Sequence, residues 1–259
     1  MQIRSVSASH GWRWLVQGLL IFRKDPVQWI LLIALLFVGS RVLLAVPYVG
    51  LLVVLVTPNF LAGLAHGAQA LEQGKPLRFG YLASGFLSNA AQLVTLGGVS
   101  LIGHVLMLAA MTAVAGDALS GIAKTMVSGA VTADTVAAMR TAAPRLLLSA
   151  IVGLGISLPI MLAVWFSPLL VFFDGVKPLP AMLLSLWACV RNIRPLLVYS
   201  AAVLGPLIIM MQIGMALTRQ PDLGIWLLAP ILVPSLYASY RDVFLNEPVE
   251  GDKPEPQQQ

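Results

Sequence analysis

The polar side chains that lie within long apolar stretches of this sequence are few, and they form no catalytic set. The candidates among them for chemistry or for lining a path are Arg41, Asn59, His66, His104 and Gln212. A histidine can bind a metal or move a proton, an arginine can bind an anion, and an amide can line a path for a solute. No Walker, dinucleotide-binding or HExxH motif is present, and spacing assigns no Ser-His-Asp set. We therefore predict no catalytic residue, no cofactor and no bound metal, and an enzyme is the least favoured class.

The two histidines are predicted at different depths of a membrane. His66 falls near the inner end of its stretch, whereas His104 lies about 20 Å from the inner face at 1.5 Å of rise per residue. They should therefore not share a metal. For both histidines and for Asn59, a hydrogen bond to a neighbouring helix is favoured over a role in lining a pore or relay. Gln212 is a further candidate lining residue.

Three other polar residues each have two interpretations. Arg41 is the only cation inside a predicted span and lies some five residues from its outer end. It can snorkel to the interface, which is favoured, or face the bundle and bind an anionic group. Asn192 and Arg194 precede Pro195 and can hold a lipid phosphate, or cap and anchor the following span, which is favoured.

The composition excludes a water-soluble globule. Hydrophobic residues make up 58% of the 259 residues and charged residues 10%, whereas soluble proteins carry about 25% charged residues. The formal net charge is +5, but the basic residues sit at the ends of apolar runs, so nucleic acid is not a predicted partner. Cys189 is the only cysteine, which excludes an intrachain disulfide and favours a buried structural thiol.

Six apolar stretches are long enough to cross a membrane, for which a helix needs about 20 residues. They are residues 27–46, 51–70, 91–115, 146–172, 196–217 and 223–240. None has the period-two alternation of a barrel strand, so the predicted fold is an all-α, polytopic transmembrane bundle. The earlier stretch at 14–22 is not predicted to be a signal peptide, because it contains Gln17 and no cleavage site follows it.

The basic residues predict the orientation of the bundle. With the N-terminus in the cytoplasm, eleven lysines and arginines lie inside, four lie outside and Arg41 lies in a span, which accounts for all sixteen. The positive-inside rule therefore places both termini in the cytoplasm. We expect one membrane domain over residues 1–245, with an outer segment at 117–145. The tail at 246–259 is rich in proline, acidic residues and glutamine, so it is predicted to be disordered.

Three shorter amphipathic stretches, at 9–24, 78–89 and 180–193, each precede a span. In the first, Trp12, Leu15 and Leu19 share a face. Such helices suit the inner interface, where their basic residues meet anionic headgroups; the alternative is that they only pack against the bundle. Two spans follow each short stretch, and the second of them carries a predicted proline kink, at Pro58, at Pro168, and at Pro230 with Pro234. The order of short helix, span and kinked span thus occurs three times, which predicts three diverged repeats.

Three sequence patterns resemble a family of uncharacterised multi-pass inner-membrane proteins of Gram-negative bacteria. They are Gly11-Trp12-x-Trp14-x3-Gly18-x3-Phe22-x3-Pro26, Asn192-x2-Pro195 and Tyr237-x-Ser239-Tyr240-Arg241-Asp242-x-Phe244. The resemblance covers the chain to about residue 245 and implies six spans in the bacterial inner membrane. It supplies no catalytic residue.

Two hypotheses of function follow. The favoured one is a non-enzymatic membrane protein that contacts anionic lipids or docks a partner, either another membrane protein or a second copy of the chain. The alternative is a facilitative channel or transporter for a small neutral or anionic solute, with Arg41, Asn59, His104 and Gln212 as lining.

Overall fold

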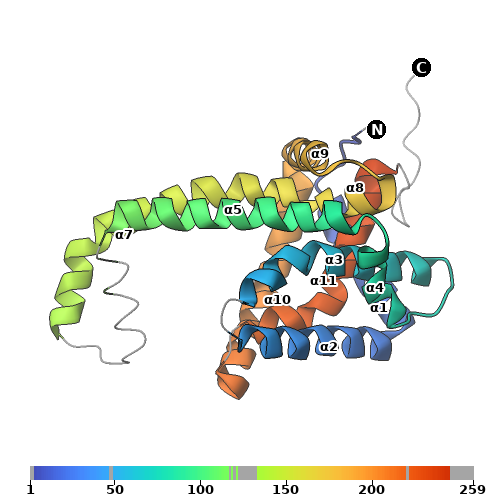
Figure 1. Cartoon of the computed structure of the whole chain (residues 1–259), viewed down its shortest axis with the longest axis horizontal. Helices are drawn as coiled ribbons and strands as arrows, with labels where there is room; N and C mark the ends of the chain where they lie inside the picture. The colour runs from blue at the N-terminus through green and yellow to red at the C-terminus, as the bar shows by residue number, and fades with distance from the viewer. Residues whose placement is uncertain are drawn as a thin grey trace. The chain divides into compact units, whose positions relative to one another are not determined.

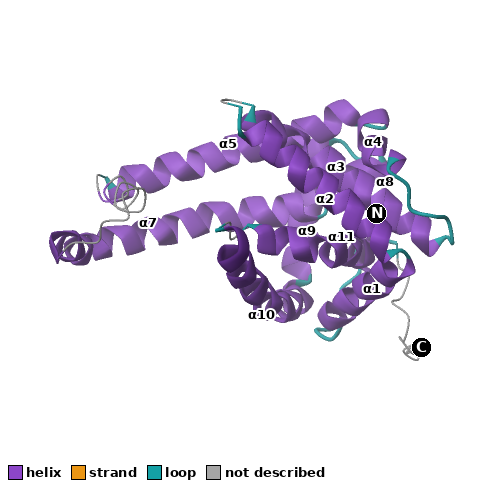
Figure 2. Cartoon of the chain, turned by 90° about the horizontal axis from the view of Figure 1, so that it is seen from below, coloured by secondary structure: helices purple, strands orange, loops and turns teal. Residues whose placement is uncertain are grey.

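The chain folds into helices throughout the part that the structure describes. The computed structural model describes residues 3–46, 49–116, 133–219 and 222–245, with residues 118 and 121. Every regular element drawn there is a helix, which confirms the all-α prediction (Figures 1 and 2). The helices are α1 (His10–Lys24), α2 (Pro26–Leu44), α3 (Gly50–Glu72), α4 (Gly80–Leu87), α5 (Ala90–Ala115), α7 (Ala133–Trp165), α8 (Ser167–Asp174), α9 (Pro178–Arg191), α10 (Ile193–Thr218) and α11 (Leu223–Phe244).

Six stretches of helix among the described residues are long and apolar enough to cross a membrane, as predicted. They are Pro26–Leu44, Leu52–Glu72, Ala90–Ala115, Arg140–Asp174, Ile193–Leu217 and Leu223–Phe244. A helix satisfies its own backbone groups, which is the requirement that hydrocarbon imposes on a spanning segment. The fourth stretch is formed by α7 and α8 together. The sixth continues four residues beyond the predicted end at Tyr240, which places Asp242 inside the helix.

Contacts divide the chain into two compact units, residues 1–97 with 163–259, and residues 98–162. In the first unit α11 packs on α1, α10, α3 and α2. In the second, the α5 and α7 segments approach each other at small residues: a Cβ on Gly103 would lie 2.7 Å from Ile160, and one on Gly153 would lie 2.5 Å from Met111. The Ser149 hydroxyl donates to the Met111 carbonyl at 2.9 Å.

The face of α1 that packs is not its most apolar one. The buried residues of α1 are His10, Gly11, Trp14, Gln17, Gly18 and Ile21, whereas Trp12, on the face shared with Leu15 and Leu19, is 57% exposed. A Cβ on Gly11 would collide with the Pro195 carbonyl of α10, and one on Gly18 would lie 2.6 Å from the Ile231 carbonyl of α11. The absence of side chains at these glycines lets α1 approach two helix backbones, so close contact decides which face is buried.

A short helix, an acidic or amide residue and a long helix follow one another three times. Asp25 separates α1 from α2 and its Oδ1 accepts from the Gln28 backbone N–H at 3.3 Å. Asn89 precedes α5 with a φ of +55° and donates from Nδ2 to the Val171 carbonyl at 2.9 Å. Asn192 separates α9 from α10. The short helices lie where the sequence predicts them; their location in an interface and the common origin of the units stay predictions.

The four prolines predicted to form kinks occupy two kinds of position. Pro58 lies inside α3, and Pro230 and Pro234 lie inside α11. At Pro168 the chain forms a break instead of the predicted kink, because α7 ends at Trp165 and Pro168 is in the first turn of α8. A proline has no N–H and favours a helix start. The Phe166 backbone N–H at the break donates to the Ser185 hydroxyl of α9 at 2.9 Å.

Parts of two predictions fall outside the described residues. These are the predicted tail at 246–259 and residues 117, 119–120 and 122–132 of the predicted outer segment.

Candidate functional site

Three consecutive residues at the end of α11 each bind a different part of the molecule. The Tyr240 hydroxyl donates to Asp174 Oδ2, in the last residue of α8, at 2.5 Å. Arg241 Nη1 donates to Glu72 Oε2, in the last residue of α3, at 2.8 Å. Asp242 accepts from α1 and from the segment before it. Successive residues of a helix project about 100° apart, so three neighbours in sequence reach three directions in space.

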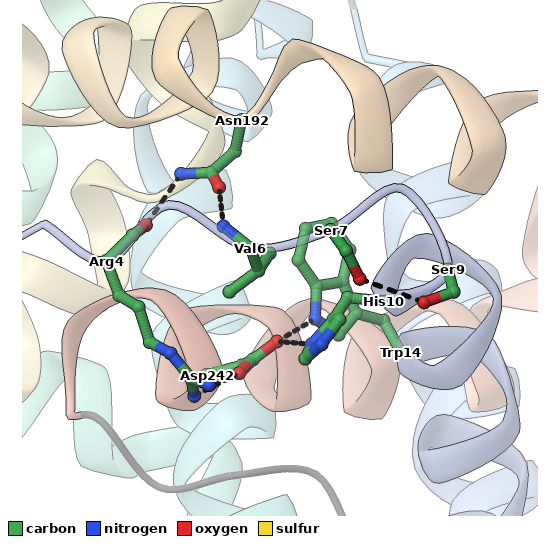
Figure 3. Close-up of polar contacts among 8 residues, drawn as sticks. All are labelled: Arg4, Val6, Ser7, Ser9, His10, Trp14, Asn192 and Asp242. Atoms are coloured by element: carbon green, nitrogen blue, oxygen red, sulfur yellow. Dashed lines mark hydrogen bonds and ion pairs between the residues drawn. The ribbon is translucent and has the colours of Figure 1, made fainter. Parts of the chain in front are cut away.

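Asp242 is fully buried, at 0% exposure, and three side chains donate to it (Figure 3). Trp14 Nε1 and His10 Nδ1 each lie 2.8 Å from Oδ2, and Arg4 Nη1 lies 3.2 Å from Oδ1. An ionised carboxylate only accepts, so the contact with His10 uses the Nδ1–H form of the ring. A buried charge is tolerated when it is paired and hydrogen-bonded in this way.

The segment before α1 is held by Asn192 (Figure 3). Asn192 Oδ1 accepts from the Val6 N–H at 2.9 Å, and Nδ2 donates to the Arg4 carbonyl at 3.0 Å. The Arg4 N–H donates to the Val243 carbonyl at 3.0 Å. The amide thus forms the pair of bonds that a neighbouring backbone would form. Its side chain makes no capping bond to α10, so Asn192 anchors the N-terminal segment to the junction of α9 and α10.

The residues of this cluster bind one another in a way that favours structure over catalysis. His10 and Asp242 resemble two members of a catalytic triad, but both are buried and both carboxylate oxygens already accept hydrogen bonds. A general base must lie within hydrogen-bond distance of the proton that it abstracts. Among the residues that the structure describes, no group of three or more side chains is arranged to hold a metal ion. The cluster joins the first and last segments of the described chain.

Arg41 has a protein carboxylate as its partner. Its Nη2 forms an ion pair with Asp222 Oδ2, at the residue before α11, and its guanidinium carbon lies 5.1 Å from the centre of the Phe37 ring. The Arg41 side chain is one third exposed.

Asn59 and His66 lie in contacts between helices. Asn59 is fully buried and its Nδ2 donates to the Gly85 carbonyl of α4 at 2.8 Å. The His66 ring lies 5.0 Å from the Tyr81 ring and 5.4 Å from the Phe172 ring. Asn59 therefore bonds to a second helix, whereas His66 contacts aromatic rings of α4 and α8 and its Nδ1 has no hydrogen-bond partner among the described residues.

The remaining candidates are exposed and do not join the cluster. His104 Nδ1 lies 2.7 Å from the Ser100 carbonyl, so its bond is made within α5 and not with a neighbouring helix. Gln212 and Arg194 are exposed on α10. Of the candidate site residues predicted from the sequence, only Asn192 takes part in the cluster around Asp242 and the N-terminal segment.

The last span is predicted to end at Tyr240, before the first charged residue, whereas the helix continues to Phe244 and contains Asp242. Hydropathy falls where two charged residues follow each other, but the helix continues because the carboxylate of Asp242 is buried and accepts from three donors. One feature of the sequence pointed to this cluster: Trp14, Asn192 and Asp242 all belong to the patterns that carry the family resemblance.

Cys189 is fully buried in α9. Burial raises the pKa of its thiol to about 12, against a smaller opposite effect of a hydrogen bond with Ser185. The thiolate is the reactive form of cysteine, so this geometry gives an inert structural thiol.

Comparison with known proteins adds one relative. No family model and no solved structure matches the chain. A probable inner membrane protein of Burkholderia thailandensis is 26% identical over 269 residues, an alignment that covers 96% of each chain. Similarity along nearly the whole length, together with six membrane-length helices, fits an uncharacterised family of inner-membrane proteins and identifies this chain as an integral membrane protein.

Proposed function

We propose that this protein is a non-enzymatic protein of the bacterial inner membrane that contacts anionic lipid headgroups through short helices, with both termini in the cytoplasm. The observation that carries the proposal is the exposed surface of α9. This helix has 14 residues, too few to cross the roughly 30 Å hydrocarbon core at 1.5 Å per residue.

Opposite faces of α9 have different surroundings. Ala181, Met182, Ser185, Ala188 and Cys189 are buried against the protein. A second row, spaced by four, four and three residues, is exposed and consists of Leu179, Leu183, Trp187 and Val190. Trp187 is 60% exposed. Because the helix is apolar on its outer as well as its inner face, its outer face suits the hydrocarbon boundary, where tryptophan is enriched.

Basic side chains flank this apolar row. Lys177 precedes α9, Arg191 ends it and Arg194 follows in the first turn of α10, and all three are exposed. Near an anionic membrane surface each such residue contributes about 1 kcal/mol of attraction. The same combination recurs at α1, where exposed Trp12 is followed by exposed Arg23. These features support headgroup contact as the role of the short helices.

The test measures lipid preference at Trp187. The full-length protein is reconstituted into nanodiscs that contain brominated phosphatidylglycerol or brominated phosphatidylcholine, and bromine quenching of tryptophan fluorescence is recorded. A Trp187→Phe variant isolates the contribution of Trp187 among the six tryptophans. Replacing Arg191 and Arg194 together by glutamine should reduce the preference for the anionic lipid roughly thirtyfold, because two residues at about 1 kcal/mol each amount to about 2 kcal/mol.

The matched control replaces Arg140 and Arg145 of α7 by glutamine, since both are also exposed, and should leave the preference unchanged. Equal quenching by the two lipids in the unmodified protein would contradict headgroup contact. If vesicles that contain the protein pass a solute faster than empty vesicles do, that result would instead favour the facilitative-transport alternative.

A further inference from the structure

An apolar groove lies between α2, α3 and α11. It has a volume of about 390 Å³, and its walls include Ile33 and Leu36 of α2, Val56 and Phe60 of α3, and Trp226 and Val233 of α11. We propose that this groove binds one acyl chain of a membrane phospholipid. The site is separate from the headgroup contacts of α9, and the proposal depends on the membrane location alone.

The two hydroxyl groups of the groove wall already donate hydrogen bonds within their own helices. Ser40 and Thr57 contribute hydroxyls to the wall. The Ser40 hydroxyl donates to the Phe37 carbonyl and the Thr57 hydroxyl to the Val53 carbonyl, each at 2.7 Å. A polar solute would lose its hydration here and would find no free hydroxyl donor in the wall, which is unfavourable. A hydrocarbon chain has no such cost.

The length and position of the groove match one leaflet. Along α2 it extends from Ile33 to Leu43, which is about 15 Å at 1.5 Å per residue and half of the roughly 30 Å hydrocarbon core. Leu43 is one residue from the end of α2, so the groove begins at an end of the spans and finishes near mid-membrane. Trp226 and the ion pair of Arg41 with Asp222 lie toward this end, where tails meet headgroups.

The surroundings of α2 identify hydrocarbon as the medium beside the groove. Leu35, Val38 and Val42 of this membrane-length helix are all exposed. An acyl chain therefore needs no route through water to enter the groove. Filling it also recovers the dispersion contacts that an empty apolar groove lacks.

Gly39 allows the groove to be blocked without strain. It lines the groove, and a Cβ built on it would meet no atom within 4 Å. Gly39→Leu therefore places a side chain in the groove without displacing a neighbour. Gly205 of α10 has the same open surroundings but is not part of the groove wall, so Gly205→Leu is the matched control. Ala229→Leu blocks the groove from its α11 wall as a second variant.

The probe is phosphatidylethanolamine with a diazirine in its acyl chain, reconstituted with the full-length protein into nanodiscs of unlabelled lipid. After irradiation, mass spectrometry should find the label concentrated on groove residues of α2 and α3. Gly39→Leu and Ala229→Leu should reduce that labelling at least about tenfold, as expected for overfilling an apolar pocket. Gly205→Leu should leave it unchanged.

Labelling of the groove that persists in both blocking variants would overturn the proposal. Crosslinks from the groove to a second copy, in place of lipid, would overturn it in favour of self-association. If the blocking variants fail in this way while replacement of Arg191 and Arg194 still reduces the anionic preference, the acyl-chain site is wrong and the proposed function stands.

Discussion

Asp242 shows how a charge can be kept within an apolar protein. Its carboxylate accepts from Trp14, His10 and Arg4, and none of its surface is exposed. Removing one partner of such a group leaves the others buried and unsatisfied, which costs more than the intact arrangement contributes. The ion pair of Arg41 with Asp222 differs, because its side chains are 33% and 44% exposed.

Asp242→Ala should therefore lower stability strongly. We expect a loss of about 3–5 kcal/mol, the range for breaking a buried pair. Asp242→Asn, which keeps the volume and one acceptor oxygen, should lose less. The measurement is the unfolding midpoint of the detergent-solubilised protein at a fixed scan rate, because membrane proteins seldom unfold reversibly.

Asp222→Ala is the matched control for this measurement, since an exposed pair contributes about 0–1 kcal/mol. Equal midpoint shifts for Asp222→Ala and Asp242→Ala would refute the role assigned to the buried carboxylate.

Cys189 provides a second prediction for a single residue. Because burial raises the pKa of its thiol to about 12, the neutral thiol dominates at pH 7 and still does at pH 9. Maleimide should label the folded protein very slowly at both pH values and quickly after denaturation in SDS. A cysteine introduced at exposed Ser7 in a Cys189→Ala background is the positive control. Rapid labelling of the folded, unmodified protein at pH 7 would show that the thiol is accessible.

At the scale of elements, α1 shows why a helical pattern alone does not identify the packed face. The apolar row that includes Trp12 is the obvious candidate from the sequence, yet the buried row contains Gly11, Gln17 and Gly18. Water drives apolar faces inward in a soluble protein, whereas lipid solvates them as well as the protein interior does. Close backbone approach and hydrogen bonds to Asp242 then select the face.

Gly18→Leu should detach α1 from α11, because even a Cβ would lie 2.6 Å from the Ile231 carbonyl. We expect a loss of about 1–3 kcal/mol, as for other overpacked interiors. The readout is the rate of limited proteolysis between α1 and α2, together with the unfolding midpoint. Gly80→Leu is the control, because a Cβ at Gly80 meets no atom within 4 Å. The assigned contact is incorrect if both variants are equally resistant to protease.

At the scale of the whole molecule, the distribution of basic residues sets the expected topology. Alkaline phosphatase should be inactive when fused after Gly175, between α8 and α9, and active when fused after Arg219, between α10 and α11. Green fluorescent protein at the C-terminus should fluoresce. The physical reason is the retention of lysine- and arginine-rich segments in the cytoplasm. The reverse pattern in all three fusions would mean that the protein is inserted the other way.

The six membrane-length helices and the three short helices before them were predictable, because each depends on residues close together in the chain. The buried state of Cys189 was predictable because free cysteines are among the most buried residues. A spanning helix needs only a run of apolar residues of sufficient length, and its backbone bonds are local. Composition likewise determined that lipid surrounds the protein.

Only the tertiary structure decided where the polar groups meet. Arg4 and Asp242 are 238 residues apart, and Val6 and Asn192 are 186 residues apart. Spacing carries no information about such pairs, since helix packing and not periodicity brings them together. The same holds for the acyl-chain groove, whose lining comes mainly from α2, α3 and α11. In this protein hydrophobic length determines the elements, and close packing with long-range hydrogen bonds determines how they are joined.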